Sequence, residues 1–121
     1  MPTQSVLVVD DSATQLHLIA SLLRRRGYDV ITAADGEDAL VQAMTRRPRL
    51  VLLDVLLPGK NGFHVCRQLK TMPETSSTRV ILLTSKGQES DRFWGMKQGA
   101  DDYVTKPYSD AEILAAVARQ L

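Results

Sequence analysis

Five short apolar runs, each followed by a longer amphipathic stretch, are the feature that most constrains the fold of this chain. The runs are too short to be helices and most are rich in valine and leucine; they lie at residues 5–9, 28–33, 50–53, 80–83 and 102–105. Such runs are typical of strands that are buried on both faces of a sheet. Because strands that alternate with helices are joined by right-handed crossovers, we predict an α/β domain with a central parallel sheet covered by helices on both faces.

Helix signals fill the stretches between these runs. Ser12 is a good N-cap, the apolar residues after it recur at helical spacing, and Gly27 marks the end of that helix. The other predicted helices are one with the apolar residues Ala39, Leu40, Ala43 and Met44, one over 63–72, one over 90–98, and one that begins at Asp110. The sequence therefore predicts five strands and five helices.

The length and composition exclude several classes of protein. A chain of 121 residues is one ordinary domain, so we expect a single domain over residues 1–121 with no output domain. Fifteen basic and 14 acidic residues give a net charge of +1, which excludes a protein that binds nucleic acid by charge. The single cysteine, Cys66, excludes an internal disulfide and a multi-thiolate metal site, and its helical spacing predicts a core residue. No apolar run approaches the ~18 residues of a membrane span, and we expect a cytoplasmic protein.

Polar residues follow four of the predicted strands. Asp10 and Asp11 follow the first strand, Asp54 the third, Thr84 the fourth and Lys106 the fifth. In doubly wound sheets the functional groups lie at the carboxyl ends of the strands, near the point where the strand order switches. We therefore expect these five side chains to lie together at one end of the sheet.

The charges of this group indicate a metal ion and an anion. The carboxylates of Asp10, Asp11 and Asp54 cannot all stay ionised at close range unless a cation joins them, and Mg²⁺ suits carboxylate and phosphate oxygens. Lys106 supplies a compact positive charge and Thr84 a hydroxyl donor. A carboxylate nucleophile beside these groups is what the formation of an aspartyl phosphate requires.

Four motifs at these positions resemble one family. VLVVDDS (6–12), VLLDVLLPGKNG (51–62), LLTS (82–85) and GADDYVTKP (99–107) occur in the family's order and at its intervals. Over nearly its whole length, the sequence resembles the response-regulator receiver domain of two-component signalling. The resemblance implies a flavodoxin-like doubly wound five-stranded parallel sheet with the strand order 2-1-3-4-5. It also implies a switch that phosphorylation activates.

The resemblance assigns roles to the acidic residues. It implies that Asp54 accepts the phosphoryl group. It also implies that Asp10 and Asp11 hold Mg²⁺ together with Asp54 and the backbone carbonyl of Leu56. An ordinary explanation exists for each, since strand-end aspartates also cap turns and helices.

The resemblance also assigns roles at the ends of the last two strands. Thr84 and Lys106 are the residues that would hold the phosphoryl group. Tyr103 matches the family's switch aromatic, whose ring moves inward when Thr84 is drawn to the phosphate, although aromatic residues suit strands in any case. The bond between Lys106 and Pro107 matches the family's usual cis peptide bond.

The implied partners are proteins. They are a sensor histidine kinase or phosphotransfer protein and a downstream effector protein, with no nucleic acid and no membrane. The predicted partner face comprises the fourth helix, the fifth strand and the fifth helix, around Trp94, Tyr103 and Tyr108. Segments 74–86 and 93–107 are similar to the single-domain receivers of twitching-motility and chemotaxis-like pathways. We expect a monomer or weak dimer that is no enzyme apart from self-catalysed phosphotransfer and dephosphorylation.

Two alternatives use the same residues differently. A haloacid-dehalogenase-type phosphatase also has an aspartate nucleophile and Mg²⁺, but its D-x-D-x-T motif fits neither residues 10–12 nor residues 54–56. A binding module with the receiver fold would never take phosphate, and the intact Asp54, Thr84 and Lys106 argue against it.

Overall fold

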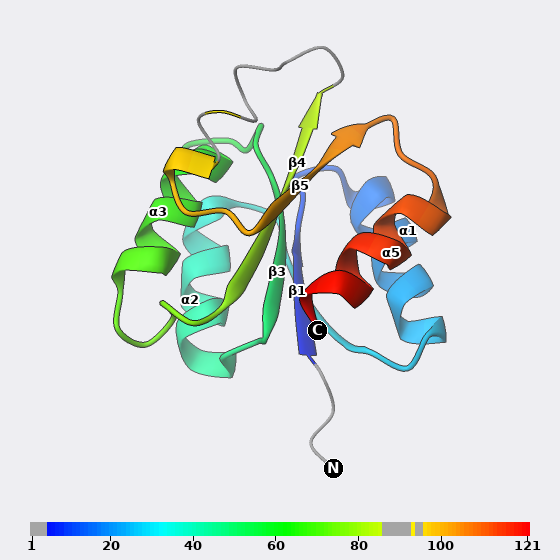
Figure 1. Cartoon of the computed structure of the whole chain (residues 1–121), viewed down its shortest axis with the longest axis horizontal. Coiled ribbons are helices and arrows are strands. Elements are labelled where there is room, and N and C mark those ends of the chain that lie inside the picture. Colours follow the sequence, from blue (N-terminus) through cyan, green and yellow to red (C-terminus); the bar gives the residue numbers. More distant parts are fainter. Residues whose placement is uncertain (1–4, 86–92, 94–95) are drawn as a thin grey trace.

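Five parallel strands form one sheet with the order β2-β1-β3-β4-β5 in this computed structural model (Figure 1). The structure describes residues 5–85, 93 and 96–121. The strands are β1 (Ser5–Val9), β2 (Asp29–Ala33), β3 (Leu50–Asp54), β4 (Arg79–Ser85) and β5 (Asp102–Lys106). Every neighbouring pair in this sheet is parallel. The predicted flavodoxin-like strand order is therefore confirmed.

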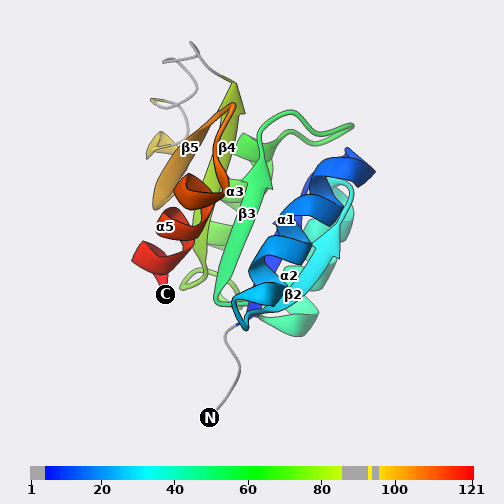
Figure 2. The ribbon, with the colours of Figure 1, turned by 90° about the vertical axis from the view of Figure 1, so that its right-hand side faces the viewer.

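Helices cover both faces of the sheet (Figures 1 and 2). Helices α1 (Ala13–Arg25) and α5 (Asp110–Gln120) lie on one face, and α2 (Gly36–Arg46) and α3 (Gly62–Thr71) lie on the other. The described residues thus contain four helices where the sequence predicts five. The predicted fourth helix, over 90–98, lies mostly outside the described residues, and within that range only Phe93, Met96 and Lys97 are assigned to a helix. No helix in the described part of the chain has the length and apolar character that a membrane crossing requires.

The centre of the sheet is buried on both sides. All five residues of β3 are buried, as are four of the five in β1. Side chains alternate along β1, so that Leu7 and Val9 enter the core on the α2–α3 face while Val6 and Val8 enter the core on the α1–α5 face. This two-sided burial is the reason that the strands appear in the sequence as continuous apolar runs rather than as alternating ones.

Side-chain caps start the helices close to the ends of the strands. The Ser12 hydroxyl accepts a hydrogen bond from the backbone N–H of Gln15 at 3.3 Å, which starts α1 just after β1. At the other end of the chain, Ser109 and Glu112 form a reciprocal capping box at the start of α5. Each cap satisfies backbone donors that the first turn of a helix leaves unpaired.

The packing of α2 differs from the prediction at one residue. Ala39, Leu40 and Ala43 are buried, but the side chain of Met44 is 42% exposed. Successive residues of a helix are rotated by about 100°, so Met44 lies at the border of the apolar stripe rather than within it. Cys66 is buried as predicted, and burial raises the pKa of its thiol to about 11.

The loop after β3 returns to the end of that strand at Gly62. The Gly62 N–H donates to the carbonyl oxygen of Val55 at 2.8 Å. A Cβ atom at Gly62 would collide with the carbonyl oxygen of Asp54 and lie 2.7 Å from Cα of Val55. Both obstacles are backbone atoms that no side-chain rotation can move. The absence of a side chain at Gly62 therefore lets α3 begin directly behind the strand end that carries Asp54.

We expect Gly62→Ala to destabilise the fold by about 2–3 kcal/mol, because the new methyl group must push the backbone of β3 away. The matched control is Gly59→Ala. Gly59 has a φ of +74° but open space around its missing Cβ, so only the left-handed backbone opposes alanine there, at about 1 kcal/mol. Urea denaturation measures both losses. Equal losses in the two variants would contradict the close approach at Gly62.

Candidate functional site

The parallel register brings the predicted site residues to one end of the sheet. In the pairing of β1 with β3, Val9 lies opposite Leu53, so that Asp10 follows one strand where Asp54 ends the other. Leu83 of β4 lies opposite Asp54, and Lys106 at the end of β5 lies opposite Ser85. Carboxylates from two strands and an ammonium group from a third thus meet at the carboxyl ends of the strands.

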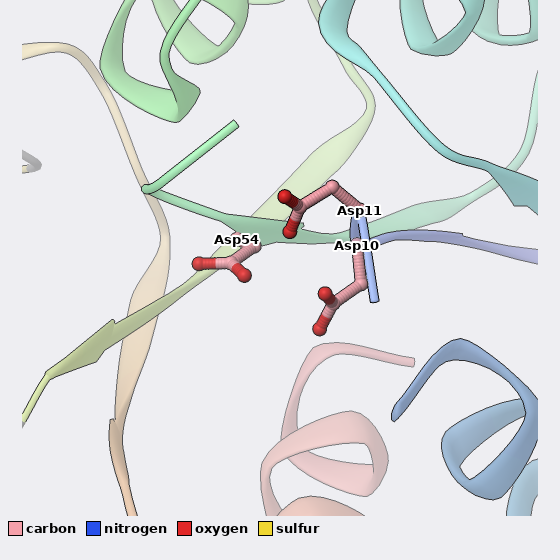
Figure 3. Close-up of side chains that lie close together, drawn as sticks. All are labelled: Asp10, Asp11 and Asp54. Carbon is pink, nitrogen blue, oxygen red and sulfur yellow. The ribbon is translucent and has the colours of Figure 1, made fainter. Parts of the chain in front are cut away.

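Three carboxylates form the centre of this site (Figure 3). One oxygen each from Asp10, Asp11 and Asp54 can be chosen so that all lie within 4.8 Å of one another. Asp10 is 1% exposed and Asp54 4% exposed, whereas Asp11 is exposed. At this separation the carboxylates repel one another, and burial removes the water that would screen the two inner ones.

The two oxygens of Asp10 have different environments. Oδ1 accepts a hydrogen bond from the backbone N–H of Ser12 at 2.9 Å. Oδ2 is buried and has no hydrogen-bond partner among the described residues. Burial raises the pKa of Asp10; the Ser12 hydrogen bond opposes this shift, and the negative charge of Asp54 adds to it. Without a cation, therefore, ionisation of Asp10 is less favourable in this site than in water.

Both oxygens of Asp54 accept hydrogen bonds. Oδ1 accepts from the backbone N–H of Leu56 at 3.1 Å, and Oδ2 accepts from the ammonium group of Lys106 at 2.9 Å. The ion pair with Lys106 joins the ends of β3 and β5 across the intervening β4. The bond to the Leu56 amide holds the first turn of the loop after β3, while the Leu56 side chain is exposed. Asp54 is thus held in one orientation from two sides.

The chemistry of the donors fits a hard divalent cation. Carboxylate oxygens are the ligands that Mg²⁺ prefers in proteins, together with water. The unpartnered Oδ2 of Asp10 is a buried acceptor that a cation would satisfy. A cation would also remove the repulsion among the three carboxylates. The ligand role predicted for the Leu56 carbonyl stays a prediction, since Leu56 contacts Asp54 through its backbone amide.

The predicted switch residues share one face of the sheet. Thr84 is buried near the end of β4. Leu82 lies opposite Tyr103 and Thr84 opposite Thr105, so the alternation of side chains puts Thr84 and Tyr103 on the same face. Tyr103 is partly buried against the core on the α2–α3 face. The two side chains therefore lie on neighbouring strands and on the same side of the sheet.

Two of the residues predicted for the partner face, Tyr103 and Tyr108, pack against different cores, and the partner face itself stays a prediction. Tyr108 packs against the core on the α1–α5 face, opposite to Tyr103, and Trp94 lies outside the described residues. The Tyr108 hydroxyl is buried and has no hydrogen-bond partner among the described residues. Burial raises the pKa of Tyr108 to about 12, and the charges of Asp10 and Asp54 add to this shift. Tyr108 follows Pro107, whose peptide bond with Lys106 is cis, as the resemblance implies.

Two features of the site escaped sequence reasoning. The Asn61-Gly62 pair indicates a turn, but its sequence does not show that Gly62 contacts the backbone of Asp54. The buried hydroxyl of Tyr108 has a weak signal in the sequence, because Tyr108 directly follows the strand end that carries Lys106. The first depends on the path of the loop after β3, and the second on the packing of residues that are distant in the sequence.

Comparisons with known proteins agree with this geometry. The sequence matches the family model of the response regulator receiver domain over residues 6–118. Protein PilH of Pseudomonas aeruginosa is 41% identical over 112 residues, which are 93% of each chain. The alkaline phosphatase synthesis transcriptional regulatory protein PhoP of Bacillus subtilis is 46% identical over 114 residues, and this chain spans only 47% of its length.

Solved structures share the whole architecture. A putative response regulator from Chloroflexus aurantiacus superimposes with a TM-score of 0.94 at 34% identity and covers 98% of both chains. The chemotaxis response regulator CheY4 of Vibrio cholerae has a TM-score of 0.93 at 29% identity, over 99% of this chain and all of the other. The described part of the chain therefore has the fold of these regulators.

We expect Asp10→Asn to stabilise the metal-free protein by about 1 kcal/mol at neutral pH, because it removes a buried charge that has two like neighbours. The sign follows from the raised pKa of Asp10: the fold prefers the protonated form and loses stability as the group ionises with rising pH. Asp35→Asn is the control, because Asp35 caps α2 and asparagine caps equally well. Urea denaturation without divalent cations measures both. A less stable Asp10→Asn would contradict the electrostatic account.

Proposed function

This chain belongs to the response regulator receiver domain family, and on that basis we propose that phosphorylation of Asp54 activates it as a switch in two-component signalling. The donor in this proposal is the phosphohistidine of a sensor histidine kinase or phosphotransfer protein. The phosphorus–nitrogen bond breaks, a phosphorus–oxygen bond forms at the Asp54 carboxylate, and the imidazole leaves. The observation that carries the proposal is the buried Asp54 carboxylate, which shares one site with two further carboxylates and with Lys106.

Asp54 is suited to attack because each of its oxygens accepts only one hydrogen bond from the described residues, which fixes the carboxylate and leaves lone pairs available. The Leu56 amide and Lys106 fix the carboxylate, and a fixed nucleophile loses little orientational freedom on the way to reaction. Lys106 is partly exposed, so its ammonium group can contact an incoming anion while it stays near Asp54. Its positive charge would stabilise the negative charge on the phosphoryl oxygens.

Magnesium is the proposed cofactor. Asp10, Asp11 and Asp54 would hold it, with the Leu56 carbonyl as a further ligand. When bound, the ion supplies positive charge against the phosphoryl oxygens and lowers the repulsion between the anionic donor and this acidic site. The side chains of Asp10 and Asp54 are kept in place by backbone amides of the residues that follow them, so the ligands are preorganised.

Thr84 and Tyr103 are the proposed readout of phosphorylation. The Thr84 hydroxyl would donate to the phosphoryl group on Asp54, and Tyr103, on the same face of the sheet, would follow its movement. Phosphorylation can shift such an equilibrium only by the difference in its interactions with the two conformations. The surface that changes would include β5 and the segment that contains Trp94.

The proposed output is docking to another protein. The similarity to PilH supports a place in a chemotaxis-like pathway of pilus motility. In this proposal the chain is cytoplasmic, acts on no separate substrate and catalyses only its own phosphorylation and dephosphorylation. A receiver fold that binds partners without taking phosphate is the second candidate, and the complete set of Asp54, Thr84 and Lys106 argues against it.

The direct test is phosphorylation by a small phosphodonor. We expect incubation with acetyl phosphate and Mg²⁺ to add one phosphoryl group, measured by intact-protein mass spectrometry and labile to hydroxylamine. Asp54→Asn should abolish the modification. Lys106→Gln should slow it by roughly two orders of magnitude, because a positioned charge at the transferred group is lost.

Asp29→Asn is the matched control, since Asp29 is an exposed aspartate at the opposite end of the sheet. It should be phosphorylated at the wild-type rate. Modification that persists in Asp54→Asn would show that another residue accepts the group. A wild-type chain that stays unmodified while a known receiver is phosphorylated in the same solution would favour the binding module.

A further inference from the structure

Two polar atoms near the acidic site are buried and unpartnered among the described residues: Oδ2 of Asp10 and the hydroxyl oxygen of Tyr108. A buried polar group without a partner destabilises a fold, and such groups are rare in native structures. Asp10 follows β1 and Tyr108 follows β5, so two segments far apart in the sequence bring unpartnered atoms to the same end of the sheet. Their common location calls for one explanation.

The Asp10 carboxylate and the Tyr108 hydroxyl lie at the same end of the sheet and are electrostatically coupled. In the view of Figure 3 the Asp10 carboxylate points toward the side on which the ribbon of α5 lies, and α5 begins two residues after Tyr108. The charges of Asp10 and Asp54 both act on the Tyr108 hydroxyl, the effect of Asp10 being the larger. The tyrosine ring is anchored in the core on the α1–α5 face. The hydroxyl therefore reaches the acidic site from the side opposite to Thr84.

Their chemistry is complementary. The Tyr108 hydroxyl stays protonated at neutral pH because its pKa is about 12, so it can donate a hydrogen bond. Oδ2 of Asp10 can only accept one when the group is ionised, and Oδ1 already accepts from Ser12. No direct bond joins the two groups. One water molecule between them would satisfy both, as buried waters do between polar groups that make no direct bond.

We propose that Tyr108 is a positioning residue of the magnesium site: its hydroxyl donates to a water molecule that in turn donates to Oδ2 of Asp10. Each carboxylate oxygen has two lone pairs, so Oδ2 can accept from this water and still contact the ion, and the water holds the Asp10 carboxylate in the orientation in which it binds the ion. This inference rests on the proposed function, because the orientation of Oδ2 of Asp10 matters only if that carboxylate binds a metal ion. Groups that hold metal ligands from behind commonly tune metal affinity.

The test is Tyr108→Phe, which keeps the ring in the core and removes only the hydroxyl. Titration with MgCl₂ alone, by isothermal calorimetry and without phosphodonor, measures the affinity for the ion. We expect the dissociation constant to rise about three- to tenfold, the effect of one hydrogen bond. The melting temperature of the metal-free variant should stay close to that of the wild type, because the ring keeps its packing in the core and only one water-mediated contact is lost.

Tyr28→Phe is the matched control. Tyr28 packs against the same core but lies just before β2, at the opposite end of the sheet. Its affinity for Mg²⁺ should equal that of the wild type. An unchanged affinity in Tyr108→Phe, or an equal loss in Tyr28→Phe, would overturn the proposal. A loss of affinity accompanied by a lower melting temperature of the metal-free Tyr108→Phe would assign the hydroxyl to packing and also overturn it.

The proposal and the function on which it rests fail in different ways. A wild-type chain that binds no Mg²⁺ overturns the role of Tyr108, since there is then no ligand to orient. A wild-type chain that binds Mg²⁺ but takes no phosphoryl group from acetyl phosphate overturns the proposed function alone. An unchanged affinity in Tyr108→Phe, in a chain that is phosphorylated on Asp54, overturns the role of Tyr108 alone.

Discussion

Parallel hydrogen bonding between β1 and β3 is the constraint on which the rest of this structure depends. It brings Asp10 beside the end of β3, where Asp54 lies, and so forces two buried carboxylates together. A slip of one residue in either strand would turn the side chains of that strand to the opposite face. The apolar side chains in both cores hold this register. A slip of one residue would move the side chains of β1 or β3 that pack in one core into the other core. The acidic site is therefore a consequence of core packing.

The repulsion that this register creates is only partly relieved within the chain. Lys106 and the Leu56 amide satisfy Asp54, whereas one oxygen of Asp10 has no partner in the part of the chain that the structure describes, and the pKa of Asp10 is raised. Functional sites are where proteins commonly depart from the rules that stabilise a fold. Burial of the apolar residues at the centre of the sheet offsets the free-energy cost of these close carboxylates, since β3 is buried along its whole length. Stability and the proposed chemistry thus oppose each other at Asp10, and a bound cation would reconcile them.

Much of this arrangement could be predicted from local patterns. Continuous apolar runs predicted the strands because burial on both faces removes the alternation of polar residues, and β1 has the predicted bounds. The strand-end positions of Asp10, Asp54 and Lys106 followed from the same runs. Prediction failed where a local pattern does not fix the depth of burial, as at Met44, which lies at the border of its helical stripe. The motifs of the family added the strand order and the cis bond before Pro107, both of which the structure has.

The sequence by itself determined which chemical groups stand at the ends of the strands, because hydrophobic periodicity and turn residues are encoded over a few neighbouring positions. Only the tertiary structure decided how those groups are satisfied: that Asp54 pairs with Lys106, that Oδ2 of Asp10 lacks a partner among the described residues, and that Tyr103 and Tyr108 enter opposite cores. The physical reason is distance along the chain. Hydrogen bonds and burial at this site join segments that are dozens of residues apart, and their geometry is set by how the helices pack on the two faces of the sheet.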